Sequence, residues 1–138
     1  MKILVSFLAI LLAACASSSP GRGSTKAGNP SLCDIVDNVA NYENSVVDIS
    51  VLAEPALHGF GVSLTDAACP GKGIFLLAGS KFDDDKVFIW MLKQLYPGYP
   101  DDDGYQDVKV RIRAKGTIVR RSSRNLLTTF LDLQSISK

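Results

Sequence analysis

Residues 108–115 read VKVRIRAK, and this stretch decides the fold class of the chain. Apolar and basic side chains alternate along it, which is the pattern of a strand with one face in a core and the other in water. The apolar positions are Val108, Val110, Ile112 and Ala114, and the basic positions are Lys109, Arg111, Arg113 and Lys115. The β-branched run at residues 117–119 extends the strand past Gly116, where a missing side chain suits a sharp bend. We therefore predict a long, bent strand in a mainly β domain.

Four shorter strands are predicted around this one. β-branched and alternating residues indicate strands at residues 45–52, 62–65 and 73–78, the last of them buried, and we expect Glu54-Pro55 to interrupt the first. On the other side, a turn at residues 121–125 leads to a last strand at about residues 126–136.

Two helices complete the prediction. The first runs from Pro30 to about Ala40, with apolar residues at helical spacing. The second follows Ser80, which stands three residues before Asp83, as in a capping box. Its apolar stripe is formed by Phe88, Met91, Leu92 and Leu95, and it ends at residues 96–98.

The order strand, strand, strand, helix, strand, strand over residues 45–137 resembles the OB-fold, a five-stranded barrel. The resemblance implies a mainly β fold with one or two helices. One helix would plug the open end of the barrel, and a short N-terminal helix would precede the first strand. A different five-stranded α+β meander is the alternative.

The first 14 residues have the pattern of a secretory signal. Lys2 supplies a positive charge, an apolar run follows, and Ala13 and Ala14 are small. The apolar run at residues 3–14 is shorter than the roughly 20 residues that a bilayer-spanning helix needs. We therefore expect this segment to be removed.

The run Leu12-Ala13-Ala14-Cys15 resembles the lipobox of bacterial lipoproteins. The resemblance implies cleavage between Ala14 and Cys15, a diacylglycerol on the Cys15 thiol and an acyl chain on its new amino group. Ala16 in place of aspartate implies, by the Gram-negative sorting rule, an outer-membrane anchor with the domain in the periplasm. The inner membrane, the cell surface and an ordinary secretory signal that ends near a cysteine are the alternatives. This lipid is the only added group expected, and we predict no cofactor.

The remaining chain divides into a tether and one domain. Residues 15–29 are small, polar and rich in Gly and Ser, so we expect a flexible coil with a span of about 20 Å. Residues 30–138 are long enough for a single domain with its own core.

The chain has three cysteines, and lipidation of Cys15 leaves Cys33 and Cys69. An even pair in an oxidising compartment predicts a disulfide. The alternative is a redox-active or metal-binding pair, although the chain contains no Cys-x-x-Cys and only one histidine.

The formal net charge of +1 excludes the overall basicity of a dedicated nucleic-acid binder. Between residues 109 and 124, however, there are seven basic residues and no acid. We predict a ligand face here for phosphate, a carboxylate-bearing peptidoglycan stem or an acidic protein. Its residues are Lys109, Arg111, Arg113, Lys115, Arg120 and Arg121. The alternative is a solvated strand face that prevents edge pairing.

Motifs for catalysis and metal binding are incomplete. Residues 101–104 read DDDG, but Tyr105 stands where a calcium loop needs Asp or Asn, and no Glu follows. His58 is the single histidine, and no Gly-x-Ser-x-Gly elbow accompanies it. We therefore predict a non-catalytic binding or envelope-structural module that contacts an envelope protein or peptidoglycan, and not nucleic acid. The alternative is a small cell-wall hydrolase or an enzyme accessory or inhibitor.

Overall fold

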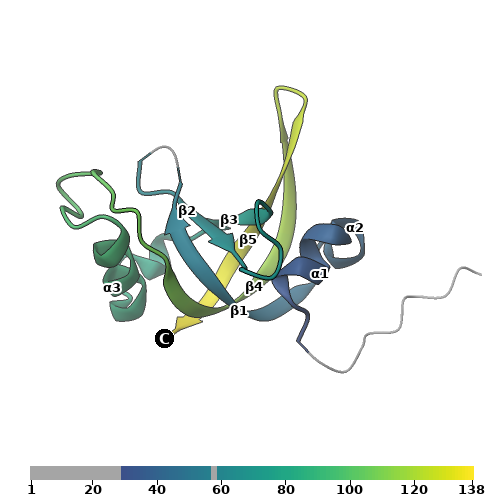
Figure 1. Cartoon of the computed structure of the whole chain (residues 1–138), viewed down its shortest axis with the longest axis horizontal. Helices are drawn as coiled ribbons and strands as arrows, with labels where there is room; N and C mark the ends of the chain where they lie inside the picture. The colour runs from purple at the N-terminus through teal and green to yellow at the C-terminus, as the bar shows by residue number, and fades with distance from the viewer. Residues whose placement is uncertain (1–28, 57–58) are drawn as a thin grey trace, which may run out of the picture.

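The computed structural model describes residues 29–56 and 59–138, and five strands within them form a closed barrel (Figure 1). The strands follow the order β1-β2-β3-β5-β4, in which β3 and β5 are parallel and the other neighbours antiparallel. Their bounds are β1 Val46–Pro55, β2 Val62–Thr65, β3 Gly73–Leu77, β4 Val110–Ser123 and β5 Leu126–Ser137. This closure confirms the predicted OB-fold-like barrel, because a meander would pair neither β1 with β4 nor β3 with β5.

The long strand β4 closes the barrel because it pairs with two partners. Its first half pairs with β1, from Val110 to Thr117, and nearly its whole length pairs with β5. The register with β5 shifts between Lys115 and Gly116, so a bulge bends the strand at the predicted glycine. A Cβ at Gly116 would lie 2.3 Å from the backbone oxygen of Asp132. Glycine is therefore required for the close approach of β4 and β5.

The core lies inside the barrel and under helix α3 (Lys86–Leu95). Alternation buries Ile112 and Ala114 of β4, as expected from the pattern at residues 108–115. From α3, the apolar residues Met91, Leu92 and Leu95 are buried in the same cluster. The helix thus places its stripe against the strands, which is the predicted role of the plug.

The start of α3 differs from the prediction. Residues Ser80–Phe82 form a separate 3₁₀ turn, η1, and the helix N-cap is Asp85. The Asp85 carboxylate accepts hydrogen bonds from the backbone N–H groups of Val87 and Phe88, both at 2.9 Å. The prediction of a capping box at Ser80 was wrong, because the Asp85 carboxylate accepts the hydrogen bonds of the free N–H groups at the start of this helix.

Two further boundaries were wrong. The N-terminal helix is divided into α1 (Leu32–Asp37) and α2 (Val39–Tyr42) at Asn38, whose backbone leaves the helical region. Strand β1 continues through Glu54 to Pro55 instead of ending at residue 52. Proline is tolerated because it is the last residue of the strand, where a missing N–H is harmless.

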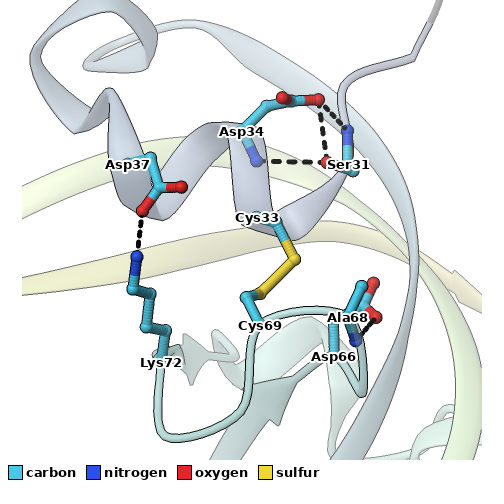
Figure 2. Close-up of a disulfide and its surroundings, with 8 residues drawn as sticks. All are labelled: Ser31, Cys33, Asp34, Asp37, Asp66, Ala68, Cys69 and Lys72. Atoms are coloured by element: carbon cyan, nitrogen blue, oxygen red, sulfur yellow. Dashed lines mark hydrogen bonds and ion pairs between the residues drawn. A yellow bond between two sulfur atoms is a disulfide. The ribbon is translucent and has the colours of Figure 1, made fainter.

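A disulfide between Cys33 and Cys69 joins α1 to the turn between β2 and β3, as predicted (Figure 2). Around it, Ser31 and Asp34 form a capping box that starts α1. An ion pair between Lys72 and Asp37 links the same turn to the last residue of α1. These links position α1 so that its buried residues Leu32 and Ile35 join the barrel core.

Candidate functional site

The predicted basic face of β4 lies beside acidic residues of β1. The outward-facing residues of β1 include Asp48 and Glu54 at its two ends, and the register brings Lys115 opposite Asp48. Glu54 forms an ion pair with Lys109, whose Nζ lies 2.9 Å from the Oε2 of Glu54. Strand β1 therefore neutralises part of the basic run, although its two acidic residues lie more than 50 positions earlier in the sequence.

Arg113 and Asp48 form the best-aligned ion pair of this face. The Arg113 Nε lies 2.7 Å from Oδ1 of Asp48, and Nη2 lies 3.1 Å from Oδ2, so the contact is bidentate. These hydrogen bonds hold the pKa of Asp48 below its usual value, although partial burial acts in the opposite direction. On the outer face of the barrel, Arg113 is thereby paired with a residue of the protein itself.

The other cations of the predicted face differ in their surroundings. Arg120 lies 3.5 Å from the Glu43 carboxylate, and the guanidinium of Arg121 lies 5.7 Å from the centre of the Phe130 ring. Arg111 is exposed and stands opposite the apolar Leu52, and Glu54, the nearest acid of β1 on its diagonal, pairs with Lys109. In the part of the chain that the structure describes, Arg111 takes part in no ion pair. Lys115 and Arg121 are also exposed and without an ion pair among the described residues, but Arg111 is the one that stands opposite Leu52, a residue of the polar groove described next.

Two adjoining grooves run over the outer face of β1, β2 and β3, beside this arginine. The first has a volume of about 480 Å³ and is partly polar. Its lining includes Leu52, Glu54, Ser63, Thr65, Asp66, Lys72, Phe75 and Lys109. The second has a volume of about 620 Å³ and is mainly apolar. Its lining includes Glu54, Pro55, Ala56, Gly61, Val62, Ser63, Phe75, Leu76 and Phe130.

Phe75 lies where the two grooves meet, and sequence reasoning did not identify it. Strand β3 was expected to be buried, but only Ile74 is fully buried, and the Phe75 side chain is 42% exposed. The parallel pairing of β3 with β5 brings Phe130 beside it, with ring centres 5.9 Å apart. The alternation around Ile74 could have indicated that Phe75 faces outward. That Phe130 lies beside it could not be predicted, because the contact depends on the pairing of β3 with β5 when the barrel closes.

One rim of the apolar groove is fixed by a hydrogen bond from the residue that follows helix α3. Tyr96, the residue after α3, is fully buried, and burial raises the pKa of its phenol. Its hydroxyl donates a hydrogen bond of 2.6 Å to the backbone oxygen of Gly61, which lines the groove. The loop between β1 and β2 is thereby fixed to the plug helix. The rim is anchored to the core at this point.

The remaining candidate residues contribute little to this face. In the aspartate-rich loop, the Asp102 carboxylate accepts a hydrogen bond from the Gly104 N–H at 2.9 Å. Residues 29–56 and 59–138 contain no group of three or more His, Cys, Asp or Glu that could hold a metal ion. His58, Ala14 and Cys15 lie outside the described residues. No helix among the described residues is long and apolar enough to cross a membrane.

Comparison with known proteins found no protein-family model and no curated protein that matches this chain.

Proposed function

We propose that this chain is a lipid-anchored outer-membrane lipoprotein whose domain faces the periplasm and binds an anionic envelope ligand without catalysis. The ligand face comprises the two grooves together with Arg111 on strand β4. The observation that carries the proposal is the position of Arg111: it is exposed, has an apolar neighbour on β1, and lies two residues from Lys109, which lines the polar groove.

The chemistry of this face supports an anion attached to an apolar or cyclic body. A guanidinium binds a carboxylate or phosphate through two parallel hydrogen bonds. A hydrogen bond to a charged group contributes about 1.5–3 kcal/mol. Phe75 and Phe130 offer apolar ring surface in the adjoining groove. Peptidoglycan combines carboxylates with sugar rings, so it is the ligand class that we would test first.

Replacing Arg111 with glutamate is expected to weaken binding to purified peptidoglycan sacculi by about tenfold or more. The substitution removes a charge-assisted hydrogen bond and places a like charge beside the carboxylate, and 1.4 kcal/mol already corresponds to tenfold. The measurement is co-sedimentation of the mature protein with sacculi over a range of protein concentrations.

The matched control is Lys93→Glu, which makes the same change in net charge on an exposed position of α3. We expect this control to bind sacculi as the unchanged protein does. Full binding by the Arg111→Glu protein would contradict the proposed face. An equal loss in both variants would also contradict it, because the effect would then follow net charge alone.

The anchor is supported by the lipobox pattern and by the energetics of acylation. Each buried methylene contributes about 0.8 kcal/mol, so two or three acyl chains hold a protein stably where one chain is marginal. A Cys15→Ser variant is expected to accumulate as an uncleaved precursor without lipid, measured by the intact mass of the protein from cell membranes. The Cys33→Ser/Cys69→Ser variant is the control and should be cleaved and acylated normally. Normal cleavage of the Cys15→Ser protein would contradict the lipoprotein assignment.

A further inference from the structure

Strands β4 and β5 extend beyond the barrel as a two-stranded hairpin, which we call the arm (residues 120–129). β1 pairs with β4 only as far as Thr117, and β3 pairs with β5 only from Phe130 onward. Figure 1 shows the arm as a yellow-green projection at the top of the view. Residues 121–127 are all exposed, so this outer part of the arm has solvent on both faces and at both edges.

The arm ends in a tight turn flanked by two exposed leucines. Arg124 and Asn125 both have positive φ, 48° and 67°, as a two-residue hairpin turn with the right-handed strand twist requires. Next to this turn, the Leu126 side chain is 71% exposed and that of Leu127 is 56% exposed. Successive strand residues point to opposite faces, so the two leucines leave the arm on opposite sides. A protein docked on one face would cover only one of them.

Two exposed arginines, Arg121 and Arg124, accompany the leucines of the arm. Arg121 shares the face of Leu126, because Ser123, the cross-strand partner of Leu126, lies two residues from Arg121 on the same strand. On the other face, Arg120 is half-buried at the base of the arm and pairs with Glu43. Arg124 is in the turn, and residues 118–131 contain no acid. An arginine carries its charge at the end of an apolar stem, so it can reach lipid phosphates while a neighbouring leucine lies among acyl chains. The tip thus combines two apolar side chains with the exposed guanidinium groups of Arg121 and Arg124.

We propose that the tip of the arm inserts into the interface of an anionic lipid bilayer. A fluid apolar medium surrounds the tip and covers both leucines at once, and anionic headgroups complement the exposed Arg121 and Arg124. This inference rests on the proposed membrane anchor, which would keep lipid at high local concentration. The 15 residues from Cys15 to Asn29 are joined by 14 Cα–Cα steps and can extend to about 48 Å, whereas the 12 residues of β5 span about 41 Å. The tether is therefore long enough for the arm to reach the membrane that holds the anchor.

The test uses the mature acylated protein in lipid vesicles, with Asn125 replaced by cysteine and labelled with an environment-sensitive fluorophore. The disulfide and the acylated Cys15 leave the added cysteine as the single free thiol. In vesicles of phosphatidylglycerol and phosphatidylcholine, we expect a blue shift and several-fold stronger quenching by nitroxide lipids than for a label at Gln106. Gln106 is exposed in the loop between α3 and β4, which lies away from the arm (Figure 1).

Two variants separate the contributions of the tip. Leu126→Ser/Leu127→Ser and Arg121→Ser/Arg124→Ser, each carrying the label at residue 125, are expected to lose most of the quenching. In vesicles of phosphatidylcholine alone, the unchanged arm should also be quenched several-fold less. All four substituted side chains are exposed, so the barrel should keep its thermal unfolding temperature.

The proposal is overturned if the label at residue 125 is quenched no more than the label at Gln106, or equally in both lipid compositions. Protection of the label only after addition of periplasmic protein would overturn it in favour of a protein partner. The intact mass of the protein is measured first, so that a missing acyl anchor is recorded separately from an arm that does not bind lipid.

Discussion

Replacing both Cys33 and Cys69 with serine is expected to lower the free energy of unfolding by about 4 kcal/mol and the unfolding temperature by about 15 °C. The disulfide closes a loop between residues that are 36 apart in the sequence, and it restricts the unfolded chain accordingly. It also holds α1, whose Leu32 and Ile35 are fully buried, against the barrel (Figure 2). The measurement is urea and thermal unfolding followed by circular dichroism.

A chemical control accompanies the double variant. A strong reductant should destabilise the unchanged protein by a similar amount and leave the serine variant unaffected, because the variant has no bond to reduce. If the unfolding temperature of the double variant stays within about 2 °C of the unchanged protein, α1 and the Lys72–Asp37 ion pair hold this region without the disulfide. That result would contradict the stabilising role assigned to the bond.

Replacing Gly116 with alanine is expected to destabilise the barrel by about 2–3 kcal/mol. The new Cβ would lie 2.3 Å from the backbone oxygen and 2.9 Å from the carbonyl carbon of Asp132. Both contacts are to backbone, so no flexible side chain can move away, and β4 must separate from β5 at the bulge. The same unfolding measurements apply.

Gly79→Ala is the matched control for this substitution. Gly79 has an ordinary φ of −77°, and a Cβ there would meet nothing within 4 Å. We expect this control to change stability by less than about 0.5 kcal/mol. Equal stability of the two alanine variants would show that the barrel relaxes at the bulge without cost.

Local patterns predicted the elements of this fold well. Strict alternation placed Ile112 and Ala114 in the core because a half-buried strand must separate apolar from polar side chains. Errors arose at boundaries where two local signals competed. Ser80 and Asp85 both suit a helix start, and the carboxylate whose geometry meets the free N–H groups defines the cap. Pro55 suggested a strand end, and the strand ends there, three residues beyond the predicted boundary.

The candidate ligand face was predicted only in part. Sequence alternation placed Arg111 and Arg113 on one outer face, but which of them is paired depends on the register with β1. Asp48 lies diagonally across from Arg113 and binds it, whereas Glu54, the acid diagonally across from Arg111, pairs with Lys109. A two-residue change in that register would place Arg111 diagonally across from Asp48, where Arg113 now stands. The charge pattern alone therefore overestimated the number of cations available to a ligand.

The sequence by itself determined the strand and helix order, the pairing of the two downstream cysteines and the basic character of β4. The element order and the basic character of β4 follow from periodicity and composition, and the cysteine pairing follows from the even number of cysteines left after Cys15. All three can be read from local patterns or residue counts. The tertiary structure alone decided that Phe75 meets Phe130, that Glu54 pairs with Lys109 and not with Arg111, and that the arm leaves the barrel with both leucines exposed. These properties depend on which strands become neighbours and in which register, because barrel closure joins residues that are distant in the chain.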